Sequence, residues 1–219
     1  MKRITMTLAV AALFTISAYG QGFQNLNFEL AQNLPGNPGP NGTPVSVANA
    51  LPAWTAYDAS LALSDIYYVS NNFPGASSSV ELEGGSLALS GNNLSVGLYA
   101  VGSISQTGAV PDNAESLQFE AHITDNALLV ILGGQTLSYS ALSAGPNYTV
   151  YGANIPADMD GQTEALTFLV QSPSAGNLLD NIEFSSMGVP EPSEFALISL
   201  GAMLFGLGCR RKGVIKVQC

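Results

Sequence analysis

Short apolar or alternating runs, separated by Gly, Asn, Ser and Pro, make up the chain from Phe23 onward. The apolar positions of this region do not repeat every 3.6 residues, so the pattern predicts strands. The breakers Gly84-Gly85 and Gly133-Gly134 each fall between two such runs. Many short strands at this spacing are typical of a sandwich or barrel. The predicted strands are residues 22–30, 65–70, 79–83, 86–90, 94–105, 115–123, 127–132, 135–141, 147–154, 163–171 and 178–185.

Two of these runs predict different surroundings for their strands. In 115–123 the odd-numbered residues from Leu117 are apolar and the even-numbered ones from Gln118 are polar, so one face is buried and the other faces water. Residues 127–132 are apolar throughout, which indicates burial on both faces. The segment 32–52 is rich in Pro, Gly and Asn and is predicted to be a long ordered loop of the kind that carries binding residues.

Charge divides the chain into a base-free middle and basic ends. Of the sixteen acids only Glu191 and Glu194 lie beyond residue 188, and all six basic residues are terminal. A body without Lys or Arg cannot neutralise phosphates, so nucleic-acid binding is excluded. Burial and hydrogen bonds must hold the fold together without Lys or Arg ion pairs. The basic residues are Lys2, Arg3, Arg210, Arg211, Lys212 and Lys216.

Both cysteines, Cys209 and Cys219, lie at the C-terminal end of the chain. Residues 21–188 therefore form no disulfide and hold no Cys-based metal or catalytic site. A stretch of this length can bury a core without disulfides. Residues 21–188 are accordingly predicted to be one domain.

The first twenty residues have the layout of a secretory signal peptide. Lys2 and Arg3 precede an apolar run from Ile4 to Ile16, and Ala18-Tyr19-Gly20 supplies the small residues of a cleavage site. We therefore predict that signal peptidase removes residues 1–20 and that the protein is exported. An uncleaved anchor is the alternative, but the apolar run is short for a bilayer that needs about 20 residues per crossing.

Residues 189–212 have three parts in order. Val189-Pro190-Glu191-Pro192 comes first, an apolar segment 195–209 follows, and Arg210-Arg211-Lys212 comes last. A helix over 195–209 would rise about 22 Å, so it is predicted to span a thin membrane with the basic cluster in the cytoplasm. A Pro-Glu-Pro motif, a short transmembrane helix and a basic cluster in this order resemble the PEP-CTERM sorting signal.

The resemblance implies that an exosortase-type membrane protease recognises Pro190, Glu191 and Pro192. It also implies transient insertion in the inner membrane of a Gram-negative-type bacterium, followed by release or transfer to the cell envelope or extracellular matrix. The short tail 213–219 departs from the family, whose chains usually stop at the basic cluster. A plain C-terminal anchor without sorting is the alternative.

Two stretches near the ends of the body carry a second resemblance. Asn25-Leu26-Asn27-Phe28-Glu29 and Leu179-Asp180-Asn181-Ile182-Glu183-Phe184 are similar to the opening and closing strands of galactose-binding-like jelly rolls, which include many carbohydrate-binding modules. The resemblance implies a jelly-roll-like antiparallel β-sandwich and the binding of glycans. It also implies a structural Ca²⁺ between these strands, at Glu29 and Asp180, with hydrogen bonds to backbone amides as the competing explanation.

Sugar binding would use an exposed aromatic ring that stacks on a pyranose face. The candidate rings are Trp54, Tyr57, Tyr67 and Tyr68. Tyr67 and Tyr68 are adjacent, so their side chains point to opposite faces of one strand. At most one of them can therefore stack on a sugar at the outer face of that strand. Packing over the end of the core is the competing explanation for Trp54.

No catalytic residue is assigned. His122, the one histidine of the chain, falls on the polar face of 115–123, and the sequence contains no Gly-x-Ser-x-Gly elbow. Glu81 and Glu83 share one strand face, a spacing that allows joint catalysis in glycoside hydrolysis, but solvated strand acids are the commoner explanation. The turn 158–164 lacks the length and the third ligand of an EF-hand loop.

Together these features predict a non-catalytic surface or matrix protein that adheres to extracellular polysaccharide. A purely structural envelope protein without a specific ligand is one alternative. A secreted glycan or ester hydrolase is the other.

Overall fold

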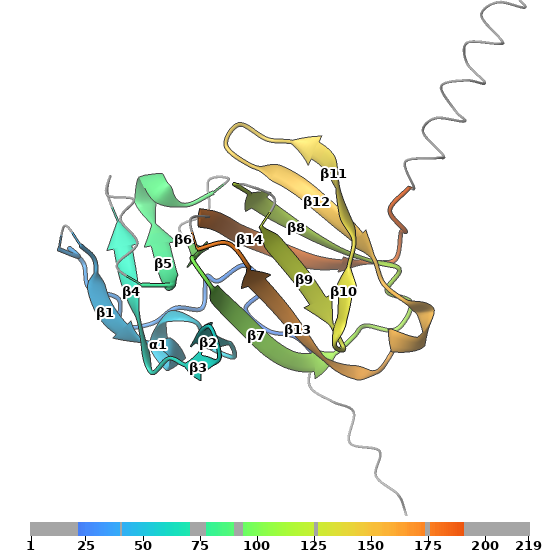
Figure 1. The fold of residues 1–219 in the computed structure, drawn as a ribbon, viewed down its shortest axis with the longest axis horizontal. Helices are drawn as coiled ribbons and strands as arrows, with labels where there is room; N and C mark the ends of the chain where they lie inside the picture. Colours follow the sequence, from blue (N-terminus) through green and yellow to red (C-terminus); the bar gives the residue numbers. More distant parts are fainter. Residues whose placement is uncertain are drawn as a thin grey trace, which may run out of the picture.

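Two β-sheets packed face to face form the body of the protein (Figure 1). The computed structural model describes residues 22–39, 41–70, 78–89, 94–124, 127–173 and 176–190. Among these residues the regular elements are strands, apart from one four-residue α-helix and two short 3-10 helices. The predicted all-β sandwich is confirmed.

The larger sheet has eight strands. From one edge to the other they are β1 (Thr43–Ser46), β4 (Asp65–Ser70), β5 (Val80–Gly84), β6 (Leu94–Tyr99), β14 (Gly176–Ser185), β8 (Ser116–His122), β12 (Thr149–Asn154) and β11 (Tyr139–Ala144). Neighbours in this sheet are antiparallel, except that β4 and β5 run parallel. The parallel pair departs from the fully antiparallel sandwich that the resemblance implies.

The smaller sheet has six strands, all paired antiparallel. In order they are β10 (Gln135–Leu137), β9 (Leu128–Leu132), β13 (Thr163–Val170), β7 (Gly102–Ala109), β2 (Thr55–Asp58) and β3 (Leu61–Ala62). The hairpin from β9 to β10 turns at Gly133 and Gly134, whose φ angles of 55° and 77° are the left-handed values that a tight two-residue hairpin turn requires. The short helices are α1 (Val47–Ala50), η1 (Gly85–Leu87) and η2 (Ala157–Met159).

Seven predicted strands are found nearly where the pattern places them. The runs 65–70, 79–83, 115–123, 127–132, 147–154, 163–171 and 178–185 correspond to β4, β5, β8, β9, β12, β13 and β14. Each of these runs lies between two breakers and stays within one sheet. The local pattern is therefore sufficient to identify them.

Two other predicted strands each divide into a pair that belongs to different sheets. The run 94–105 breaks at Ala100, where φ is 51°, and the chain passes from β6 in the larger sheet to β7 in the smaller one. The run 135–141 breaks at Ser138 between β10 and β11. At the first corner Gly102 follows the two turn residues, and a Cβ atom there would clash with the Ser79 carbonyl oxygen; the second corner has no Gly or Pro.

The remaining predictions near the N-terminal half are wrong. Residues 22–30 form turns, with a single β-bridge from Gly22 to Ala109. In the predicted strand 86–90, residues 86 and 87 belong to η1 and residues 88 and 89 form a bend. The predicted loop 32–52 contains β1 and α1. The strands β2 and β3 were not predicted, because each is too short to show a period.

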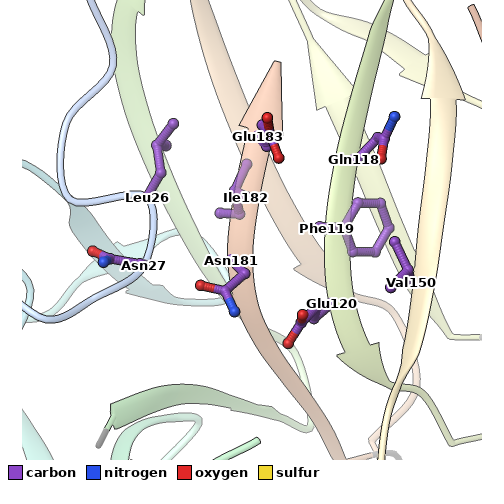
Figure 2. A pocket seen from close by; sticks show the side chains of 9 residues that line it. All are labelled: Leu26, Asn27, Gln118, Phe119, Glu120, Val150, Asn181, Ile182 and Glu183. Carbon is purple, nitrogen blue, oxygen red and sulfur yellow. The ribbon is translucent and has the colours of Figure 1, made fainter. Parts of the chain in front are cut away.

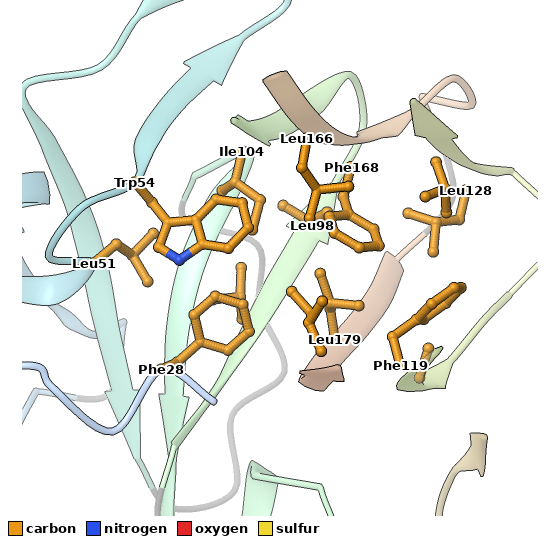
Figure 3. Packing of buried hydrophobic residues seen from close by; sticks show 14 of the residues in the cluster. Phe28, Leu51, Trp54, Leu98, Ile104, Phe119, Leu128, Leu166, Phe168 and Leu179 are labelled. Atoms are coloured by element: carbon orange, nitrogen blue, oxygen red, sulfur yellow. The ribbon is translucent and has the colours of Figure 1, made fainter. Parts of the chain in front are cut away.

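Side chains from the two sheets meet in one apolar core (Figure 3). Phe119 of β8 packs edge-on against Phe168 of β13, with the ring centroids 5.4 Å apart. The predicted alternation of β8 is confirmed, because its apolar residues are buried and His122 is exposed. The prediction for 127–132 is wrong: burial alternates along β9, and Leu129 and Ile131 are only half-buried, since the outer face of the smaller sheet is open to solvent.

The N-terminal segment closes one end of this core through Asn25. The backbone carbonyl of Asn25 accepts a hydrogen bond from the Trp54 indole N–H at 3.1 Å. Its side chain donates to the Pro52 carbonyl at 3.2 Å and accepts from the Leu30 N–H at 3.0 Å. This turn places Phe28 against Trp54, and both rings are buried. The predicted opening strand is thus a hydrogen-bonded turn that fills the core end.

The ends of the chain are predicted to carry the signal peptide 1–20 and the membrane helix 195–209, and both lie outside the described residues. Within the part of the chain that the structure describes, no helix has the length and apolar character needed to cross a bilayer. Both sorting segments therefore stay predictions.

Replacing Asn25 tests the turn that closes the core. Asn25→Ala removes the partners of the Pro52 carbonyl and the Leu30 N–H and places alanine at a φ of 50°. We expect the free energy of unfolding to fall by about 2–4 kcal/mol, measured by urea denaturation. Asn33→Ala is the matched control, because Asn33 has a φ of 55° but is exposed. It should cost about 1 kcal/mol, and equal losses in the two variants would contradict the role given to Asn25.

Candidate functional site

The face of the larger sheet that points away from the core carries a row of acids. Glu83 of β5 lies beside Ser95 of β6, and Asp180 of β14 lies beside Glu120 of β8. The Ser95 hydroxyl donates to Asp180 Oδ2 at 3.2 Å and so joins the two pairs. Three carboxylates therefore share one row across four strands, in a body without Lys or Arg.

Neutral groups donate hydrogen bonds to Asp180, to Glu83 and to the neighbouring Glu81. Asp180 is fully buried, and its Oδ1 accepts a hydrogen bond from the Asn181 N–H at 2.7 Å. Glu81 and Glu83 are 1% and 3% exposed, so the expectation that both are solvated is wrong. Glu81 Oε1 accepts from the Ser78 N–H at 3.1 Å, and Glu83 accepts from the Tyr99 hydroxyl.

The ring of Tyr99 lies against the sheet over two glycines. A Cβ atom added at Gly97 would stand 2.7 Å from Tyr99 Cε2, and one added at Gly176 would stand 2.8 Å from Cε1. Gly97 precedes Tyr99 by two residues on the same strand face, and Gly176 is its register partner on β14. Both edges of the ring thus approach the backbone, and the Glu83 carboxylate fixes its hydroxyl.

Burial changes the acid–base behaviour of this pair. Burial raises the pKa of Glu83, and the hydrogen bond from Tyr99 opposes that shift. Burial also raises the pKa of the Tyr99 hydroxyl, and the neighbouring Glu83 and Glu81 carboxylates add to the rise. Tyr99 therefore stays protonated and serves as the hydrogen-bond donor of the pair.

A hollow of about 750 Å³ opens over Tyr99 and runs across β6, β14, β8 and β12. Tyr148, in the turn between β11 and β12, forms part of its wall, and its ring folds over Gly145. His122, which is exposed, and Glu83 also line it. We call this hollow the tyrosine groove. It presents three half-buried aromatic rings next to polar side chains: Tyr99, Tyr148 and Tyr151, the last of which also packs on Phe119.

A second hollow, of about 610 Å³, lies on the same face nearer the other end of β8 (Figure 2). Its polar lining comes from the N-terminal segment, from β8 and from the irregular part of β14, where the register shifts between Asp180 and Glu183. We call it the amide groove. The polar residues that line it are Asn27, Gln118, Glu120, Asn181 and Glu183.

The four rings predicted to contact sugar are not brought together. Trp54 is 4% exposed and packs on Phe28, so its prediction as a sugar contact is wrong. Tyr68 packs against the core, whereas Tyr67 lies on the other face of β4, which confirms their opposite orientation. Tyr57 belongs to the smaller sheet. None of these four residues lines the tyrosine groove or the amide groove.

The rings that do line the tyrosine groove, Tyr99, Tyr148 and Tyr151, are not among the predicted sugar contacts. Their positions depend on strand pairing, which the sequence does not display. One local signal was present: a Gly-x-Tyr spacing at Gly97 leaves room on the same strand face for the ring of Tyr99.

The predicted calcium ligands approach the same end of β6. Glu29 Oε1 accepts a hydrogen bond from the Leu94 N–H at 3.1 Å, and Asp180 bonds to the adjacent Ser95. Among the described residues, no group of three or more His, Cys, Asp or Glu side chains gathers to hold a metal ion. Calcium binding by Glu29 and Asp180 stays a prediction, beside the hydrogen bonds that already stabilise both carboxylates.

The first residues of the predicted sorting motif are described. The Asn154 amide donates to the Val189 carbonyl at 3.0 Å and accepts from the Val189 N–H at 2.6 Å, so Val189 is held against β12 and buried. Pro190 is exposed. The other predicted sorting residues lie outside the described part of the chain: Glu191, Pro192, Arg210, Arg211 and Lys212.

Comparisons with known proteins add little to this geometry. No family model matches the chain, and no curated protein matches it. Among solved structures, the chain is similar to TmCBM61 in complex with beta-1,4-galactotriose, with a TM-score of 0.40 and 11% identity. The similarity covers 75% of this chain and 97% of that chain. At this level of similarity, nothing about the ligand of this chain follows.

The raised pKa of Glu83 gives a pH dependence with a definite sign. The pKa of Glu83 is higher in the folded protein than its ordinary value of 4.5. The contribution of Glu83 to the free energy of unfolding is therefore fully present below pH 4.5, and it is lost as the pH rises through the folded-state pKa. Glu83→Gln keeps an acceptor for Tyr99 but never ionises. Its free energy of unfolding should therefore increase relative to the unmodified protein as the pH is raised, measured by urea denaturation between about pH 4 and 8.

Asp58→Asn is the control for the lost charge, because Asp58 is exposed on β2. Comparison of the two variants separates the effect of losing one negative charge from the effect of the burial of Glu83. If the free energies of unfolding of Glu83→Gln and of the unmodified protein differed by the same amount at every pH, Glu83 would titrate alike in the folded and unfolded chains, which would contradict the prediction.

Proposed function

We propose that this protein is an exported, non-catalytic binding protein whose tyrosine groove takes an extracellular polysaccharide. The observation that carries the proposal is the ring of Tyr99, which lies over Gly97 and Gly176 on the floor of a groove open to solvent. Rigid aromatic side chains supply contact area at a low cost in conformational entropy. A pyranose ring, with its flat apolar face and its hydroxyl edges, matches such a surface.

The polar residues around the rings support a ligand rich in hydroxyl groups. His122 and Asn147 line the groove with exposed side chains, and each offers both donors and acceptors. The body lacks Lys and Arg, so it offers no cation to pair with uronate or sulfate groups. The ligand class that fits is therefore an uncharged glycan.

Removal of either ring tests the proposal. Tyr99→Ala and Tyr148→Ala should each weaken binding to an uncharged polysaccharide by about tenfold or more, because buried aromatic contacts dominate binding energy. The measurement is affinity electrophoresis of the full-length chain in gels that contain β-1,4-galactan, β-1,3-glucan, hydroxyethylcellulose or polygalacturonate. Tyr57→Ala and Tyr67→Ala are matched controls, because these rings lie outside the groove, and they should leave the mobility shift unchanged.

The same gels separate the alternatives. A structural envelope protein without a specific ligand would be retarded by none of the four polymers. Retardation by polygalacturonate alone would overturn the preference for uncharged glycans. A hydrolase would shorten the polymer, and that turnover would be lost in Glu83→Gln. Only Glu83 of the carboxylate pair lines the groove, while Glu81 is buried beside it, which supports binding without hydrolysis.

We also propose that an exosortase-type protease processes the tail after export. Val189 is held by Asn154 and Pro190 is exposed, so the motif would begin at the surface of the folded body. The membrane helix 195–209 and the cluster Arg210-Arg211-Lys212 would hold the chain in the inner membrane until cleavage.

Mass spectrometry of the mature protein from its host tests the sorting. We expect the N-terminus at Gln21 and the loss of residues 210–219 from the extracellular form. Alanine at Pro190, Glu191 and Pro192 should retain the tail and keep the protein in the membrane fraction. Recovery of an intact 210–219 segment from extracellular material would contradict the proposed processing of the tail. Glycan binding is tested separately, by the affinity gels.

A further inference from the structure

The tyrosine groove and the amide groove share the strand β8. Gln118 and Glu120 line the amide groove, and His122 lines the tyrosine groove. These three residues alternate along one strand, so they stand on the same face of the sheet. The pairing of Leu178 with His122 and of Asp180 with Glu120 shows that β14 continues beneath both grooves.

The spacing along β8 makes the two grooves neighbours. Same-face residues in a strand are about 7 Å apart, so Gln118 and His122 are separated by about 13 Å. Glu120, which is half-buried, lines one groove, and His122, which is exposed, lines the other, so the two linings meet within about 7 Å along the strand. The grooves therefore form one elongated surface along β8 rather than two isolated sites.

The two ends of this surface differ in chemistry. The tyrosine groove offers aromatic rings, whereas the amide groove offers the side-chain amides of Asn27, Gln118 and Asn181. Glu120 Oε2 is shielded from solvent and has no hydrogen-bond partner among the described residues. A shielded carboxylate oxygen without a donor is unfavourable. The Glu120 side chain as a whole is only half-buried, so a change of its rotamer would let this oxygen accept a hydrogen bond from a hydroxyl of a ligand in the amide groove.

We propose that the ligand is an extended, uncharged glycan chain that lies along β8, with one sugar on the tyrosine groove and later sugars in the amide groove. This inference rests on the proposed function and adds a second subsite and a minimum length to it. An acidic chain would meet Glu120 and Glu183 without a compensating cation, so like charges would oppose its binding.

Binding as a function of chain length tests the inference. Isothermal titration calorimetry of the full-length chain would use β-1,4-galacto-, cello- and β-1,3-gluco-oligosaccharides of two, four and six sugars. In the series that binds, affinity should rise at least tenfold from two to six sugars. Gln118→Ala should weaken the six-sugar ligand by about fivefold to tenfold and leave the two-sugar ligand within about twofold, because one hydrogen bond is lost at the far subsite only.

Gln135→Ala is the matched control, because Gln135 is exposed on β10 in the other sheet, and it should change neither affinity. Equal affinities for two and six sugars, or equal effects of Gln118→Ala on both, would overturn the second subsite while leaving the tyrosine groove as a binding site. If no series binds and the gels are also negative, the second subsite and the proposed function are overturned together.

Discussion

A body without lysine or arginine has to accommodate its carboxylates with neutral hydrogen-bond donors, and the larger sheet is built around this constraint. Asp180 is fully buried between the Ser95 hydroxyl and the Asn181 N–H. Glu83 is buried against the Tyr99 phenol. A buried charge without a partner is strongly unfavourable. Hydroxyls and backbone amides therefore take the place of ion pairs, and the sheet keeps its acids without any positive charge.

The same constraint gives the candidate site its shape. Because Glu83 needs a neutral donor, the Tyr99 hydroxyl is held beside it, and the ring comes to rest over Gly97 and Gly176. A ring fixed in this way has little conformational freedom left to lose when a ligand stacks on it. The hydrogen bond that satisfies a buried carboxylate thus also preorganises the floor of the tyrosine groove.

The fold could be predicted from the sequence where a pattern stays within one strand, as in β8, whose alternation places Phe119 in the core and His122 outside. It could not be predicted where a strand changes sheet, because the left-handed φ lies at Ala100, whereas the glycines of that run, Gly97 and Gly102, lie within β6 and β7. The site was missed for a related reason. Whether a ring faces the core or solvent depends on pairing with distant strands, so Trp54 proved to be buried and Tyr99 lines the groove.

In the proposed function, the ligand class and the geometry of the site depend on one property of the composition, the absence of Lys and Arg from the body. A lysine or arginine near the acidic row would pair with Glu83 and compete with the Tyr99 hydroxyl for it, which would release the ring from its position. The same cation would attract acidic polysaccharides to the groove. Without such a cation Tyr99 is the donor to Glu83, and the proposed ligand would be bound by stacking and neutral hydrogen bonds. In the proposed function, positive charge is needed only at the two ends of the chain, where it orients segments in the membrane.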